Sequence, residues 1–386
     1  MKFTFKTLLF LFVAFAMVGM VTSCSEDDDD ISNGGTPKIS YIRVTRPESS
    51  DSLIAKAGQG ATIAIIGENL QDARELWIND RQASLSPTFI TNTTIITTVP
   101  SNIPTEITNK MKIIFANGDS LIHDFMVDIN EPLISGMLSE YVNTGDIATI
   151  TGDYFYEPLK VTFTGGVEGE VVTVEDDVIE VRVPEGAQPG PVTVTTNFGE
   201  TESEFYFRDN RNIIAGFEET DFTGWWHGQQ YIKASDDEIP NISNNFLRMN
   251  QSVGEWGWVE MWVGSGGTIN QGTKNIPAEA FTSPEKYSLK FEINTLESLT
   301  GAELRMYMGP DMAGQRGDVY YTWKPNFNTE GQWQTVTIPW EDFWNANQQF
   351  AYNPNGYGVS FHFSGPLAFK AMFGLDNIRV VPNTIP

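Results

Sequence analysis

Short runs of alternating apolar and polar residues dominate this chain after its first two dozen residues. Runs such as 289–294 and 357–363 alternate with period two and are bounded by turn residues. Period two places successive side chains on opposite faces of a strand, and no long helical period appears here. Because 34 Gly and 20 Pro are spread along the chain, the pattern predicts an all-β protein of short strands.

The middle of the chain contains a repeat. The run GATIAIIGENL at 60–70 is echoed by GDIATITGDYF at 145–155, about 85 residues later. A strand ends in Val-Pro at 99–100 in the first copy and at 183–184 in the second. Units of this length suit small β-sandwiches, so we predict one domain over 37–129 and another over 130–208.

The two copies resemble IPT/TIG immunoglobulin-like domains. The matching features are an opening proline (Pro37 and Pro132), a strand ending in Gly-x-x-Leu or Gly-x-x-Phe, and a strand ending in Val-Pro. The resemblance covers 37 to about 207. It implies two tandem immunoglobulin-like β-sandwiches, which serve as spacers, dimerisation units or DNA binders in different proteins, and we expect spacers here.

The segment 209–386 differs in composition, because it holds nine of the ten tryptophans. Any one of these rings, taken alone, could equally fill a core. Strand parity separates them in the run 256–263. Trp256, Trp258, Glu260 and Trp262 share one face there, and Val259 lies on the other. A carboxylate is rarely buried without a partner, so we expect the face of Glu260 to be open to solvent.

Neighbouring strands repeat this division. Arg305 and Tyr307 alternate with apolar residues in 304–308, and His362 does so in 357–363. A sugar rests its C–H face on an aromatic plane while polar groups bind its hydroxyls, so such a sheet face suits glycan binding. The predicted ligand-binding residues are Trp258, Trp262, Glu260, Trp225, Trp226, Trp323, Arg305, Tyr307 and His362.

The ends of this segment resemble the first and last strands of jelly-roll carbohydrate-binding modules. The matching runs are 212–219, followed by Trp225 and Trp226, and 373–380. The resemblance implies a larger jelly-roll-like β-sandwich over 209–386. It also implies a structural calcium on Glu218 and Asp376, although two metal-free carboxylates are the favoured alternative. We expect no other cofactor.

The first 36 residues predict the location of the protein. Lys2 and Lys6 precede an apolar stretch, and small residues precede Cys24, the only cysteine. This resembles a bacterial lipoprotein signal over 1–23, which implies cleavage and lipidation at Cys24. Val21 departs from the family, which usually has Leu there. An ordinary secretory signal is the alternative.

Five consecutive carboxylates at 26–30 lie in a segment, 24–36, that we predict to be a flexible tether. The block resembles the export signal of some surface lipoproteins, which implies an outer-membrane protein that faces the cell exterior. The formal net charge of −26 argues against nucleic acid as a partner, since such binding needs clustered basic residues. We expect membrane contact through the lipid anchor only.

The order of the parts is similar to that of the second, variable glycan-binding lipoprotein of polysaccharide utilisation systems. This resemblance implies non-catalytic capture of a polysaccharide, often a β-glucan or hemicellulose, beside an outer-membrane importer and its lid lipoprotein. Two other functions stay open. One is an adhesin or structural protein that binds a protein partner, and the other is a glycoside hydrolase, although no spacing identifies a pair of catalytic carboxylates.

Overall fold

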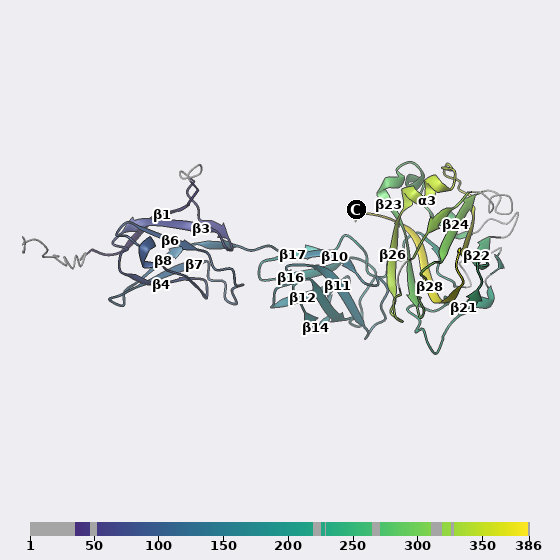
Figure 1. Cartoon of the computed structure of the whole chain (residues 1–386), viewed down its shortest axis with the longest axis horizontal. Helices are drawn as coiled ribbons and strands as arrows, with labels where there is room; N and C mark the ends of the chain where they lie inside the picture. The colour runs from purple at the N-terminus through teal and green to yellow at the C-terminus, as the bar shows by residue number, and fades with distance from the viewer. Residues whose placement is uncertain are drawn as a thin grey trace, which may run out of the picture. The chain divides into compact units, whose positions relative to one another are not determined.

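The computed structural model describes residues 35–46, 52–218, 225–227, 229–264, 271–309, 319–325 and 328–384. These residues form β-sandwiches built almost wholly from strands, which confirms the predicted fold class (Figure 1). The chain divides into two compact units, Met1–Asp128 and Ile129–Pro386. Among the described residues, every helix is too short or too polar to span a membrane.

The first unit contains one sandwich of two sheets. One sheet has the order β1-β3-β6 and the other β5-β4-β7-β8. Its strands are β1 (Lys38–Val44), β3 (Thr62–Glu68), β4 (Ala73–Ile78), β5 (Arg81–Ala83), β6 (Thr94–Thr98), β7 (Lys110–Phe115) and β8 (Ser120–Asp124), with β2 (Lys56–Gly58) paired to β9 (Met126–Asp128) and a 3-10 turn η2 (Pro87–Phe89). Ile65, Leu76 and Ile113 are fully buried between the sheets.

The second unit begins with a sandwich of the same strand order. Its sheets run β10-β11-β15-β14 and β13-β12-β16-β17. The strands are β10 (Leu133–Met137), β11 (Ile147–Asp153), β12 (Leu159–Phe163), β13 (Val167–Glu168), β14 (Glu170–Val174), β15 (Val178–Arg182), β16 (Val192–Thr196) and β17 (Gly199–Glu202). The sequence repeat therefore corresponds to a repeated sandwich, with β14 as the added strand.

One glycine in each copy explains the repeated motif. A Cβ added to Gly67 would lie 2.0 Å from the carbonyl oxygen of Lys38, and one added to Gly152 would lie 1.9 Å from that of Leu133. Gly67 is the next-to-last residue of β3 and Gly152 that of β11, and the paired strand, β1 or β10, has a register shift there. Only a residue without a side chain fits this approach.

The rest of the second unit is a larger sandwich of two sheets. One has the order β20-β21-β28-β23-β26, with β18 paired to β28, and the other has the order β19-β22-β27-β24-β25. The strands are β18 (Ile213–Ala215), β19 (Trp225–His227), β20 (Ile232–Lys233), β21 (Phe246–Val253), β22 (Trp258–Gly264), β23 (Tyr287–Thr295), β24 (Glu303–Gly309), β25 (Tyr321–Trp323), β26 (Gln334–Pro339), β27 (Gly358–Ser364) and β28 (Phe369–Pro382). The helices are η3 (Gln229–Tyr231), η4 (Gln271–Asn275), η5 (Ala278–Phe281), η6 (Pro284–Lys286) and α3 (Trp340–Ala346).

A buried ion network joins the second sandwich to this larger one. Glu140, which follows β10, accepts hydrogen bonds from Arg379 of β28 (2.6 Å) and from Lys290 of β23 (2.5 Å). Arg379 also donates to Glu292 of β23 at 2.8 Å, and both of these side chains are fully buried. The second sandwich thus supplies a counter-ion inside the larger one, which adds a structural role to the expected role of spacer.

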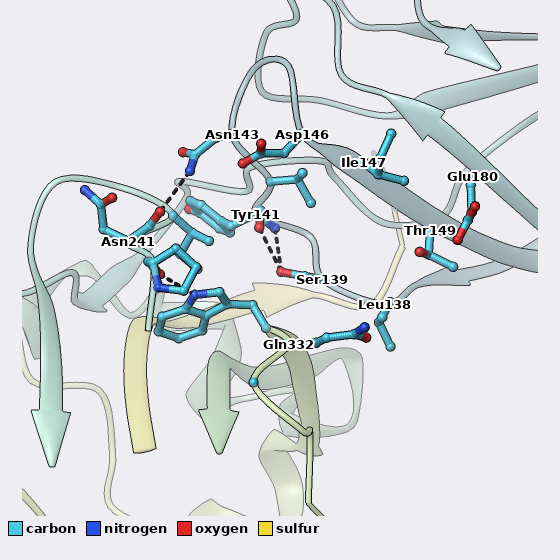
Figure 2. Close-up of a pocket in the computed structure, with 15 residues that line it drawn as sticks. Leu138, Ser139, Tyr141, Asn143, Asp146, Ile147, Thr149, Glu180, Asn241 and Gln332 are labelled. Atoms are coloured by element: carbon cyan, nitrogen blue, oxygen red, sulfur yellow. Dashed lines mark hydrogen bonds between the residues drawn. The ribbon is translucent and has the colours of Figure 1, made fainter. Parts of the chain in front are cut away.

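A hollow of about 310 Å³ lies at this junction and is lined by both sandwiches (Figure 2). Its polar groups hold the walls together: the Asn143 side chain donates to the carbonyl of Asn241 (2.8 Å), and the Trp333 indole donates to the carbonyl of Pro240 (2.7 Å). Because these donors are satisfied within the protein, we assign the hollow to the joint between the domains.

Replacing Glu140 with alanine should destabilise the second unit by about 3 kcal/mol, because Lys290 and Arg379 lose a buried carboxylate. Urea denaturation of the full chain measures this change. Glu168→Ala is the matched control, since Glu168 pairs with Lys160 on the exposed surface and its loss should cost less than about 1 kcal/mol. Equal effects of the two substitutions would contradict the stabilising role of the network.

Candidate functional site

Three strands of the larger sandwich bring Glu260, His362 and Arg305 into one row of polar side chains. Strand β22 pairs with β27, and β27 pairs with β24. In this register His362 lies opposite Glu260 on one side and opposite Arg305 on the other. Directly opposed residues point to the same face of a sheet, so these side chains share the face that alternation predicted.

Trp258 is an exposed residue of this face. It is 66% exposed, whereas the next residue, Val259, is buried in the core. A hollow of about 250 Å³ adjoins it. The hollow is lined by Gln230, Tyr231, Gln251, Ser252, Val253, Trp258, Val259 and Glu260. An exposed indole beside amide and carboxylate groups can offer a flat apolar plane and hydrogen bonds to one ligand.

Arg305 lies in a cluster of charges beside this row. It contacts Glu303 at 3.4 Å, and its guanidinium carbon lies 5.1 Å from the centre of the Tyr320 ring. Lys324 contacts the other oxygen of Glu303 at 2.9 Å. The hydrogen bond from Lys324 and the charge of Arg305 hold the pKa of Glu303 below its usual value. Glu303 is therefore an ionised acceptor that orients Arg305.

Tyr307 and His362 lie on the same face but are covered. Tyr307 is 1% exposed and His362 is 9% exposed, and the Tyr307 hydroxyl lies 2.7 Å from Nε2 of His362. The ring of Tyr320 packs over Tyr307, with centroids 5.0 Å apart. Alternation predicts which face a side chain takes, but it carries no information on what covers that face.

Trp323 lies on the opposite side of the sheet from Trp258 and Glu260. Strand β25 places it opposite Leu304, a buried core residue. Its ring meets Phe291 edge to face, with centroids 5.3 Å apart, and packs against the core. The structure therefore places Trp323 on the core side of its strand, partly buried, and its role in ligand binding stays a prediction.

Three predicted tryptophans have side chains outside the described residues: Trp225, Trp226 and Trp262. The backbone of β22 has a register shift between Glu260 and Trp262. Strict alternation from Trp258 therefore ends at Glu260, and parity no longer supports placing Trp262 on the same face. The binding roles of these three residues stay predictions.

Trp256 is an exposed ring that the predicted set left out. It is 62% exposed and lies in the turn before β22, with a φ of 57°. Its N–H donates to the carbonyl of Gly365 at 2.9 Å. Alternation placed Trp256 on the face of Trp258, but this turn is not extended, so strand parity does not apply to Trp256. The neighbouring glycines, Gly254 and Gly257, were the signal that a turn intervenes.

Comparison with known proteins adds a family to this geometry. Residues 207–382 match the family model described as the surface glycan-binding protein B xyloglucan binding domain. The predicted resemblance to surface glycan-binding proteins is confirmed. The match covers the larger sandwich, including Trp258 and the row through Glu260.

Two solved structures share the fold over most of the chain. A surface glycan-binding protein, PbSGBP-B, from Prevotella bryantii has a TM-score of 0.65 and 24% identity, covering 91% of this chain and 99% of its own. SGBP-B from a complex xyloglucan utilization locus in Bacteroides uniformis has a TM-score of 0.51 and 17% identity, covering 90% and 100%.

One curated relative is an IPT/TIG domain-containing protein of Bacteroides ovatus. It is 33% identical over 143 residues, which are 36% of this chain. The aligned region spans 28% of the relative's length. It supports the IPT/TIG resemblance and leaves the activity of the whole chain to be proposed.

The predicted calcium ligands of the larger sandwich, Glu218 and Asp376, are held by hydrogen bonds. The Glu218 carboxylate accepts from the N–H and the side-chain amide of Asn245, both at 2.9 Å. The fully buried Asp376 carboxylate accepts from Ser243 (2.5 Å) and from the N–H of Asn377 (2.8 Å). Burial raises the pKa of Asp376 well above its usual value.

The described donors do not complete a calcium site. Calcium takes about six to eight oxygen ligands, whereas no cluster of three or more His, Cys, Asp or Glu side chains is found in the described ranges. The nearby Glu292 and Glu218 carboxylates also raise the pKa of Asp376, after burial. A cation would relieve this repulsion, and calcium at Glu218 and Asp376 stays a prediction.

We expect Asp376→Asn to flatten part of the pH dependence of stability. A carboxyl whose pKa is raised on folding binds its proton more tightly in the folded state. Its contribution to the free energy of unfolding therefore falls as pH rises from the ordinary value of 3.8 through the raised pKa. The difference between wild type and variant, measured by urea denaturation across this range, isolates the effect.

The same preparations test for a cation. Without bound calcium, a chelator leaves the unfolding temperature unchanged in both proteins. A fall in wild type alone would show instead that Glu218 and Asp376 hold a metal ion and that Asp376 is ionised.

Proposed function

We propose that this chain is a non-catalytic surface protein that binds a β-glucan or hemicellulose and holds it for degradation and import. The observation that carries the proposal is Trp258, an exposed indole beside a hollow lined by Glu260 and Gln251. Pyranose rings rest their C–H faces on such a plane, and the polar groups bind the hydroxyls. Xyloglucan, named by the family model, is the first polymer to test.

The proposed setting is the outer membrane. Cys24 carries the lipid, the acidic tether directs the protein to the exterior, and the importer with its lid lipoprotein acts beside it. These parts rest on the signal and architecture resemblances, since Cys24 lies outside the described residues. The name of the Prevotella relative, a surface glycan-binding protein, supports a location at the cell surface.

Binding without cleavage agrees better with the charges of the face than hydrolysis does. A glycosidase needs a carboxylic acid whose pKa is raised so that it can protonate the leaving group. Glu303 has a lowered pKa, because Lys324 and Arg305 contact it. The relatives are glycan-binding proteins, which also favours capture.

Trp258→Ala should weaken binding of a xyloglucan oligosaccharide by about tenfold or more. Loss of a large apolar contact costs about 1 to 3 kcal/mol, and about 1.4 kcal/mol corresponds to a factor of ten in affinity. Isothermal calorimetry of the full chain measures the change, with circular dichroism to check folding. Phe89→Ala is the matched control, because Phe89 is a 55% exposed ring in the first unit.

Each result decides between functions. Folded Trp258→Ala that binds like wild type would move the site away from this face. Release of new reducing ends by wild type would establish hydrolysis. If no neutral polysaccharide binds to wild type, the proposal fails and a protein-binding adhesin is favoured.

Glu260→Gln should change selectivity among oligosaccharides more than it changes stability. The substitution keeps the shape of a half-exposed side chain and replaces an acceptor-only carboxylate by an amide. We expect the ratio of affinities for xyloglucan and mixed-linkage glucan oligosaccharides to shift, while the urea midpoint stays within error. Unchanged ratios would place Glu260 outside the ligand contact.

A further inference from the structure

A second group of aromatic rings lies on the second immunoglobulin-like sandwich. Tyr154 is 37% exposed, and Tyr156 and Phe198 are half-buried beside it. The two tyrosine rings lie 6.3 Å apart between centroids, and Phe198 meets Tyr156 edge to face at 5.9 Å. The cluster lies at the end of β11, on a different domain from Trp258.

The first sandwich builds the same turn without any aromatic ring. There Asn69 has a φ of 59°, and Tyr154 has a φ of 62°. The flanking hydrogen bonds correspond as well: Leu70 donates to the carbonyl of Asn92, and Phe155 donates to that of Asp176. Tyr154 therefore occupies the place that Asn69 takes in the other copy.

This exchange is unfavourable for the backbone. Asparagine is enriched at positive φ, whereas a bulky side chain there is an outlier. The Asn69 side chain also donates to the carbonyl of Thr36 at 3.2 Å, and a tyrosine ring has no amide for this bond. A strained residue that exposes its ring indicates a role outside the fold itself.

Other aromatic residues with positive φ can be compared with Tyr154. Within the described residues they are Phe217, which is buried in the core, and Trp256, which is 62% exposed in the turn before Trp258. Phe217 has a packing role, whereas Trp256 lies next to the candidate site. Tyr154 resembles Trp256 in its exposure.

Carboxylates surround the tyrosine cluster. Asp153 and Asp176 are exposed, and after burial the charges of Asp176 and Asp153 contribute to raising the pKa of Tyr156. Rings beside carboxylate acceptors are the same chemistry as Trp258 beside Glu260. The negative charge disfavours nucleic acid and acidic polymers and suits a neutral polyol.

We propose that Tyr154 and Tyr156 form a second carbohydrate-contact site, which takes a neutral pyranoside segment of the polymer that binds at Trp258. The inference rests on the proposed function. A short oligosaccharide occupies one site at a time, whereas a polymer offers many segments. A second contact then raises the effective concentration of the polymer at the first.

The test is Tyr154→Asn in the full chain, with xyloglucan polymer and a short xyloglucan oligosaccharide as probes. Asparagine restores the residue of the first sandwich in the same backbone conformation, so the variant should fold. We expect polymer binding in native affinity gels to weaken about tenfold and oligosaccharide affinity by calorimetry to stay unchanged. Tyr154→Phe keeps the ring and should retain polymer binding.

Different results of this experiment test the second site and the proposed function. If wild type binds the polymer through Trp258 and Tyr154→Asn binds it equally well, the second site is absent and the proposed function stands. If wild type binds neither probe, both fall.

Discussion

The second unit depends on the pairing of one buried charge, the guanidinium of Arg379. A charge without water must find its counter-ions within the protein, and it finds Glu292 in its own domain and Glu140 in the preceding one. The larger sandwich therefore completes its interior with a residue of the immunoglobulin-like sandwich. Opening of this joint would remove Glu140 from both Arg379 and Lys290, and Arg379 would keep only Glu292.

The sequence predicted the scaffold well because its signals are local. Period-two alternation identifies strands, and Gly67 and Gly152 mark a close backbone approach that repeats in both copies. The same alternation placed Glu260 and Arg305 on one face, because a carboxylate or guanidinium indicates the side open to solvent. The Arg379 and Glu140 contact joins residues far apart in the chain, and no local pattern reveals it.

The site was predictable only as far as the strand stays regular. Trp258 and Glu260 precede the register shift in β22, and the structure keeps them together. Trp323 had no charged neighbour on its own strand to identify the solvent-exposed face. Its register with Leu304 places it against the core. Parity assigns faces, whereas bulges, turns and covering rings decide which faces a ligand reaches.

The ion network at this joint also affects how the proposed aromatic contacts on two domains would act together. Polymer capture by separate contacts gains affinity only when their spacing stays within reach of one chain, and flexible links dilute that gain. Glu140 holds the immunoglobulin-like sandwich that carries Tyr154 against the domain that carries Trp258. Because Glu140 pairs with Arg379 and Lys290 within the folded chain, these contacts between the two domains form without a ligand.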